Sequence, residues 1–114
     1  MTTVMDYIFK RRSIRRYQEK PVEKEKIDQL LQAGMAAPSA TNNRPLEFVI
    51  VTNDESAKFH QVLRYGKFYV PAAIVECANP EIGSARPSSF DYWVQDCSTA
   101  AQNILLAAVG LGLA

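Results

Sequence analysis

The segment FKRRSIRRY, residues 9–17, contains four arginines and one lysine within seven consecutive positions. The whole chain has 13 basic and 12 acidic residues, so acidic residues outnumber basic ones outside this segment. An extended backbone divides side chains between two faces, here Arg11, Ser13, Arg15 and Tyr17 on one and Arg12, Ile14 and Arg16 on the other. Two guanidinium groups beside a hydroxyl suit a phosphate, because their forked N–H donors match its oxygen atoms.

Two other interpretations of the arginine segment remain open. It is also typical of a solvated basic strand, or of a helix C-terminus whose positive charge complements the helix dipole. It further suits a strip that binds RNA or DNA. The net charge of +1 and the scarcity of aromatic residues alternating with the basic ones weigh against that interpretation. The sequence therefore predicts a local anion site and no nucleic-acid partner.

A second candidate is the segment PSATNNRP, residues 38–45, which has two prolines and follows a predicted helix. Its turn-forming composition predicts a loop. Backbone N–H groups and side-chain amides on such a loop are able to face a planar heterocycle. Taken alone, the composition is common in loops that have no function. The polar side chains available on it are Ser39, Thr41, Asn42 and Asn43.

Other reactive side chains give weaker signals. Cys77 and Cys97 have no CxxC motif and no histidine at ligand spacing, which indicates reduced thiols of a cytoplasmic protein and no metal site. The single histidine, His60, is expected to be a solvated residue on an amphipathic helix. Asp96 is a candidate polar anchor near an interface, and the sequence assigns no catalytic acid or base.

Helices and strands alternate around these candidate groups. Thr3 is a candidate N-cap for a short helix, and an apolar face with acidic residues in its first turn predicts a helix over 23–35. Runs of apolar and β-branched residues predict strands at 46–52 and 72–78. Residues 54–66 predict a helix with three side chains turned inward, Phe59, Val62 and Leu63. This order predicts an α+β or α/β sandwich.

The chain is expected to be helical from about residue 90 to its end. Two adjacent apolar stripes, which include Ile104 and Leu105, predict a helix buried on several sides, in a core or against a second subunit. At 114 residues, with 47% apolar and 22% charged residues, the composition fits one soluble domain without a membrane span. The apolar ending at residues 112–114, with no polar cap and no closing strand, predicts that a longer fold continues beyond it.

Taken together, the two polar segments closely resemble the nitroreductase family of flavin mononucleotide (FMN) enzymes. RRSIRRY is similar to the family's N-terminal arginine-arginine-serine-x-arginine signature, and PSATNNRPLEF to its Pro-Ser-x-x-Asn-x-x-Pro loop entering a strand. VPAAIVECANP resembles the middle strand, and YWVQDCSTAAQNILLAAVGLGL the long central helix. The matches follow the family order and cover nearly all of the chain. Arg44 and Leu46 depart from the glutamine and tryptophan of many members, which affects the expected substrate pocket.

The resemblance implies an α+β sandwich with a central sheet, flanking helices and a long buried helix, and a homodimer with FMN at its interface. Residues 1–114 would be the N-terminal part of that FMN-binding domain, which is incomplete at the C-terminus. Arg11 and Ser13 would hold the FMN phosphate with Arg12 beside them, and Arg15 would approach the pyrimidine edge of the ring. Arg16 would point away. Contacts with the ring or its ribityl chain would come from the opposite subunit, through Pro38, Ser39 and Asn42.

The activity implied by the family is a ping-pong transfer of electrons from NADH or NADPH to an electron-poor acceptor, such as a nitroaromatic or a quinone. An alternative is a flavin-binding or regulatory protein of the same fold without turnover. Lys67 falls near a position where some members place a second basic residue, although that alignment is loose.

Overall fold

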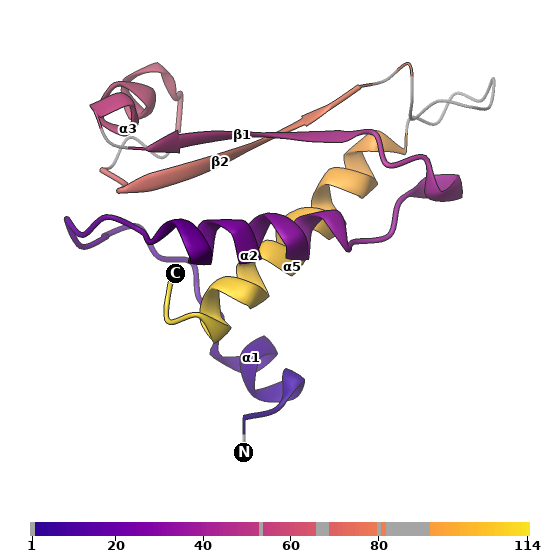
Figure 1. Ribbon diagram of the computed structural model, residues 1–114, viewed down its shortest axis with the longest axis horizontal. Helices are drawn as coiled ribbons and strands as arrows, with labels where there is room; N and C mark the ends of the chain where they lie inside the picture. The colour runs from indigo at the N-terminus through magenta and orange to yellow at the C-terminus, as the bar shows by residue number, and fades with distance from the viewer. Residues whose placement is uncertain (1, 53, 66–68, 80, 82–91) are drawn as a thin grey trace.

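The computed structural model describes residues 2–52, 54–65, 69–79, 81 and 92–114. Lys67 lies outside the described residues, as does the side chain of His60. The described part is an α+β arrangement, as predicted, and Figure 1 shows its elements in order. They are α1 (Val4–Lys10), α2 (Lys24–Met35), the short 3-10 helix η1 (Ala40–Asn42), β1 (Leu46–Thr52), α3 (Asp54–Phe59), the 3-10 helix η2 (His60–Val62), β2 (Ala72–Ala78) and α5 (Trp93–Gly110).

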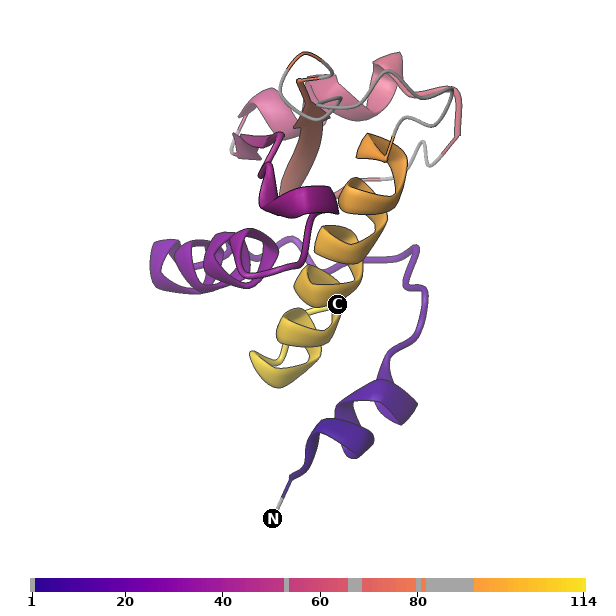
Figure 2. The same cartoon turned by 90° about the vertical axis from the view of Figure 1, so that its right-hand side faces the viewer.

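The two strands form one antiparallel pair, in register from Leu46 opposite Ala78 to Thr52 opposite Ala72. Alternate residues of β1 turn to opposite faces, so Phe48 is half-buried while Val49 remains half exposed. Helices α2 and α5 both lie on one side of this sheet in Figures 1 and 2. Both strands have the bounds that the apolar runs predict.

The core lies where α2 crosses α5 beneath the sheet. Leu30 and Gly34 of α2 are buried, together with Ala100 and Ala108 of α5. Asn103 of α5 donates a hydrogen bond from Nδ2 to the carbonyl oxygen of α2 residue Ala33, at 3.1 Å. One stripe of α5 therefore faces a small core through Ala100 and Ala108, as expected, but the prediction of burial on several sides is wrong at Leu105, which is 40% exposed.

The first helix, α1, is capped at its N-terminus and the last helix, α5, at its C-terminus, in both cases by local hydrogen bonds. Thr3 caps α1 as predicted: Asp6 N donates to Thr3 Oγ1 at 3.3 Å, and Thr3 N donates to Asp6 Oδ2 at 2.7 Å. The bonds that Thr3 donates to Asp6 Oδ2, from its backbone N and from Oγ1 at 3.0 Å, lower the pKa of the Asp6 carboxyl, because they favour its charged form. At the end of α5, Leu113 N donates to Ala108 O and Gly112 adopts φ +75, which together form a Schellman cap.

The helix predicted over 54–66 is wrong in its second half. The α-helix ends at Phe59, and a 3-10 turn follows it. The inward prediction for Val62 is also wrong, because its side chain is 79% exposed. The prediction assumed the 3.6 residues per turn of an α-helix. A 3-10 helix has three residues per turn, so its side chains point in other directions. No helix among the described residues is long and apolar enough to cross a membrane.

Candidate functional site

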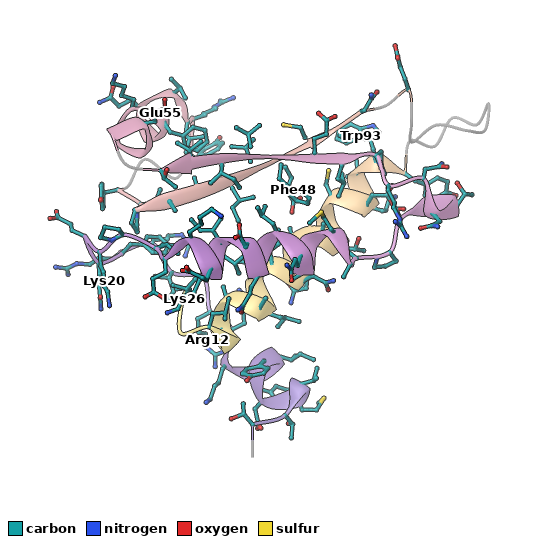
Figure 3. The ribbon with its side chains drawn as sticks, viewed as in Figure 1. Arg12, Lys20, Lys26, Phe48, Glu55 and Trp93 are labelled. Carbon is teal, nitrogen blue, oxygen red and sulfur yellow. The ribbon has the colours of Figure 1, made fainter. Side chains whose placement is uncertain are left out.

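The arginine segment follows α1 without regular secondary structure. Arg12 donates from Nη1 to the carbonyl oxygens of Phe9 and Arg11, at 2.6 and 2.8 Å, and so satisfies acceptors at the end of α1. Figure 3 shows Arg12 between α1 and the C-terminal end of α5. The Arg11 side chain is half-buried, whereas Ser13 and Arg15 are exposed. Arg12 therefore fixes the backbone from which the other candidate groups project.

The positive charge of this segment is not neutralised within the described part of the chain. The ion pairs found there join Lys24 to Asp28 and Lys26 to Glu23, both on α2 or at its start. No carboxylate of a described residue lies within 4 Å of a charged nitrogen of Arg11, Arg15 or Arg16. The guanidinium groups of Arg11 and Arg15 are therefore available to an anion.

The arginines divide between two sides of the segment. Ile14, Arg16 and Tyr17 line a cavity of about 710 Å³ between the segment, α2, the sheet and the end of α5. Arg11, Ser13 and Arg15 are not among the described residues that line it. Ile14 and Arg16 are separated from Arg11, Ser13 and Arg15 in the predicted way, but Arg12, predicted on the face of Ile14 and Arg16, is not among the described residues that line the cavity. Tyr17 departs from the alternation, since it lies on the side of Arg16; the segment is not a regular strand, so a period of two does not continue along it.

The 38–45 loop has an unusual backbone. Thr41, Asn42 and Arg44 have φ values of 51, 55 and 51, in the left-handed region. Asparagine tolerates this region, whereas a β-branched threonine is a conformational outlier there. Backbone strain of this kind persists only where surrounding contacts enforce it, and it is concentrated at ligand sites. The loop is therefore a stronger candidate site than its composition indicates.

Bonds inside the 38–45 loop connect the predicted contact residues to one another. Arg44 N donates to Ser39 Oγ at 3.0 Å, and Arg44 Nε donates to Asn42 Oδ1 at 3.1 Å. Pro38 and Asn42 are exposed and Ser39 is half-buried. The hydroxyl proton of Ser39 and the Nδ2 group of Asn42 are not used by these bonds. The loop therefore presents hydrogen-bond donors on a backbone that is already fixed.

Two residues of α5 attach this loop to the rest of the fold. Ala40 N donates to Asp96 Oδ1 at 2.9 Å, and Thr99 Oγ1 donates to Pro38 O at 3.1 Å. Asp96 is only 4% exposed. This bond makes Asp96 a polar anchor for the loop, as expected, whereas its predicted place near an interface stays a prediction. Thr99 was not predicted, although its position three residues after Asp96 places both on one helix face.

The two candidate segments lie toward opposite ends of α5 (Figures 1 and 2). The loop contacts the first turns of that helix, through Asp96 and Thr99. At the other end Tyr7 of α1 packs on Gly110, where an added Cβ would lie 3.5 Å from Tyr7 Cζ. An 18-residue helix is roughly 27 Å long. One chain therefore does not bring Arg11, Ser13 and Arg15 together with Pro38, Ser39 and Asn42.

Neither cysteine is paired in a disulfide within the described part of the chain. Cys77 and Cys97 are both free thiols, the first exposed and the second half-buried. Burial raises the pKa of the Cys97 thiol, with a further contribution from the negative charge of Glu76. A raised pKa lowers the thiolate fraction, so Cys97 is a poor nucleophile. Among the described residues, no group of three or more metal-ligating side chains is present.

Comparison with known proteins identifies relatives over almost the whole chain. A model of the "Nitroreductase family" matches residues 8–85. A Methanothermobacter thermautotrophicus protein named "Putative NADH dehydrogenase/NAD(P)H nitroreductase" is 44% identical over 96% of this chain and 57% of its own length. A Bacteroides thetaiotaomicron structure with the same name is 45% identical at a TM-score of 0.83, over 96% of this chain and 62% of that one.

A third relative was solved with a ligand. The Desulfovibrio desulfuricans structure, described as a putative nitroreductase in complex with FMN, is 31% identical at a TM-score of 0.82. The match covers 97% of this chain and 64% of the chain in that structure. The chain thus spans about three-fifths of the length of each of these three relatives.

Proposed function

Because this chain belongs to the nitroreductase family, we propose that its protein is an FMN-dependent oxidoreductase that takes electrons from NADH or NADPH. The names of its relatives, NAD(P)H nitroreductase and a nitroreductase complexed with FMN, support both cofactors. The single observation that carries the proposal is the uncompensated arginine segment, where Arg11 and Arg15 have no carboxylate partner among the described residues. A guanidinium group without a carboxylate partner is a charge-assisted donor of the kind that binds the phosphate or the electron-rich edge of a flavin.

Each side chain of the segment has a proposed role. Arg11 and Ser13 bind the FMN phosphate: they offer a guanidinium group and a hydroxyl two residues apart, and neither is among the described residues that line the cavity. Arg12 lies beside them along the cofactor. Its Nη1 is bonded to the carbonyl oxygens of Phe9 and Arg11, so only its remaining N–H groups are available for FMN. Arg15 approaches the pyrimidine edge of the ring, where a fixed positive charge favours the build-up of negative charge.

When bound, FMN would supply the two-electron chemistry, a ping-pong transfer from the nicotinamide to an electron-poor acceptor such as a nitroaromatic or a quinone. The protein's contribution is to bind and orient. The 38–45 loop presents Pro38, Ser39 and Asn42 to the ring or the ribityl chain. Arg44 is exposed, and its Nε bond to Asn42 fixes the side chain at the edge of that loop. A positive group there would favour acceptors that carry negative charge.

The complete site requires two copies of the chain. The arginine segment and the 38–45 loop are separated by most of the length of α5, so the loop of one subunit would complete the site begun by the arginines of the other. The exposed apolar residues of α1 support such an association, with Val4 at 69% and Phe9 at 65% exposure. The proposed assembly is therefore a homodimer with FMN at the interface.

An FMN titration of full-length protein tests the proposed phosphate site. Arg11→Ala and Ser13→Ala each remove a donor to a charged group, worth about 1.5–3 kcal/mol, so FMN affinity should fall roughly 10- to 150-fold. Arg16→Ala is the matched control, because it removes the same charge from the cavity side of the same segment. It should change affinity little. Equal losses at Arg11 and Arg16 would show that net charge, not a phosphate site, holds the flavin.

A further inference from the structure

The backbone of the 38–45 loop is strained at three positions. Thr41, Asn42 and Arg44 all have left-handed φ values, and none of them is glycine. The bonds within the loop are short-range ones, such as Thr41 Oγ1 to Ala40 O at 2.8 Å. Contacts of this kind move with the loop, so they do not tie it to the rest of the fold. A restraint from outside the loop is needed to hold the strained form.

At the far end of the loop Pro45 is buried, and its carbonyl oxygen accepts from Asn79 N at 2.8 Å. The part of the loop before Thr41 is restrained by one face of α5. Asp96 Oδ1 accepts the N–H of Ala40 at 2.9 Å, at the start of η1. Thr99 Oγ1 lies 3.1 Å from Pro38 O and 2.9 Å from Asp96 O, so its proton is shared between the loop and its own helix. Figure 2 shows η1 beside the N-terminal turns of α5. The two bonds hold the loop on both sides of Ser39.

Asp96 is buried near the start of α5, and one of its carboxylate oxygens holds the loop. Its Oδ2 atom is buried and has no hydrogen-bond partner in the described part of the chain. A buried polar atom without a partner costs stability, and such atoms are rare in native folds. The first turn of α5 favours a negative charge, which offsets part of that cost. An apolar side chain would pack there at lower cost, but it would leave Ala40 N–H without an acceptor.

We infer that Asp96 and Thr99 are positioning residues for the flavin. They hold the 38–45 loop in its strained form, so that Ser39 and Asn42 have the geometry for binding before FMN arrives. This inference rests on the proposed function, in which the loop contacts FMN. Neither residue touches the cofactor in this account. Their effect is to avoid the cost of ordering the loop on binding.

The variants that test this inference separate the bond to the loop from a bond within the helix. Thr99→Val keeps the shape of the side chain and removes the hydroxyl that is shared between Pro38 O and Asp96 O. Ser98→Ala is the matched control, because among the described residues the Ser98 hydroxyl donates to Val94 O of its own helix, at 2.9 Å, and not to the loop. Thr99→Ser keeps a hydroxyl at this position and should therefore preserve both the loop and FMN affinity. Asp96→Ala removes the bond to Ala40, and the Thr99 series decides the question if that variant does not fold.

Two measurements on full-length protein provide the readout. Hydrogen exchange without FMN should be faster at residues 38–44 in Thr99→Val, with β1 unchanged. FMN affinity should fall roughly 2- to 10-fold, the value for one neutral hydrogen bond, and further in Asp96→Ala. Ser98→Ala and Thr99→Ser should match the wild type in both.

The inference is overturned if Thr99→Val equals Ser98→Ala in loop exchange and in FMN affinity. It is also overturned if exchange in β1 accelerates as much as in the loop, because the bond would then support the fold in general. A wild-type protein that binds no FMN would instead refute the proposed function. In that case the exchange measurement still decides whether Asp96 and Thr99 hold the loop.

Discussion

At the scale of single residues, neighbouring arginines are used differently. Arg12 is bonded to two backbone carbonyl oxygens, and Arg16 lines the cavity. Arg15 is exposed and has no ion-pair partner among the described residues. Arginine stays protonated at any pH at which a protein is folded. Of these three, Arg15 is therefore the one that neither bonds the backbone through its guanidinium group nor lines the cavity.

For Arg15→Ala, a lower midpoint potential of the bound flavin is expected. The shift should be on the order of tens of millivolts, since about 30 mV corresponds to about 1.4 kcal/mol for a two-electron couple. Affinity for oxidised FMN should change only modestly. Arg15→Lys keeps a positive charge and should retain part of the potential, as measured by equilibration with a reference dye. An unchanged potential in Arg15→Ala would remove Arg15 from the ring edge.

At the scale of elements, the close crossing of α2 and α5 depends on Gly34. A Cβ built at Gly34 would lie 2.9 Å from Ile104 Cδ1 and 3.1 Å from Phe48 Cζ. The first contact is with the end of a flexible side chain, whereas the second is with a ring held beneath β1. The absence of a side chain at Gly34 therefore sets how near the sheet and both helices approach one another.

Gly34→Ala should destabilise the protein by about 1–2 kcal/mol in a denaturant titration. Overpacking costs roughly 1–3 kcal/mol, and the higher helix propensity of alanine returns up to about 1 kcal/mol. Adding Ile104→Val, which removes the nearest atom, should restore part of the loss. Gly110→Ala is the control, because its Cβ would meet Tyr7 at an ordinary 3.5 Å. A Gly34→Ala protein as stable as Gly110→Ala would show that the crossing is not tight.

The elements were more predictable than the contacts between them. The strands at 46–52 and 72–78 and the helix ending at Met35 follow from caps and hydrophobic periodicity, which are local signals. The bond from Asp96 to Ala40 joins residues 56 positions apart, and no local pattern specifies such a partner. The positive φ of Thr41 could not be predicted from the sequence either, because threonine rarely adopts that region.

At the scale of the whole molecule, the chain is more extended than a compact domain. Its radius of gyration is 15.2 Å, whereas a compact chain of this length has about 13 Å. Helix α1 projects away from the sheet in Figure 1, and its element contacts are chiefly with α5. Its apolar side chains are left exposed, which suits contact with a second copy. The two segments of the candidate site lie far apart in one chain, which also favours a site that is completed by a second copy.

The most direct test of the account is the visible absorbance of purified full-length protein loaded with FMN, recorded without oxygen as NADH or NADPH is added. The account predicts that the flavin band bleaches with at least one of the two nicotinamides. The colour should return when a quinone or a nitroaromatic is added. A protein that binds FMN and keeps its colour with both nicotinamides would be a flavin-binding protein without turnover. That result, or a failure to bind FMN, would contradict the proposed oxidoreductase.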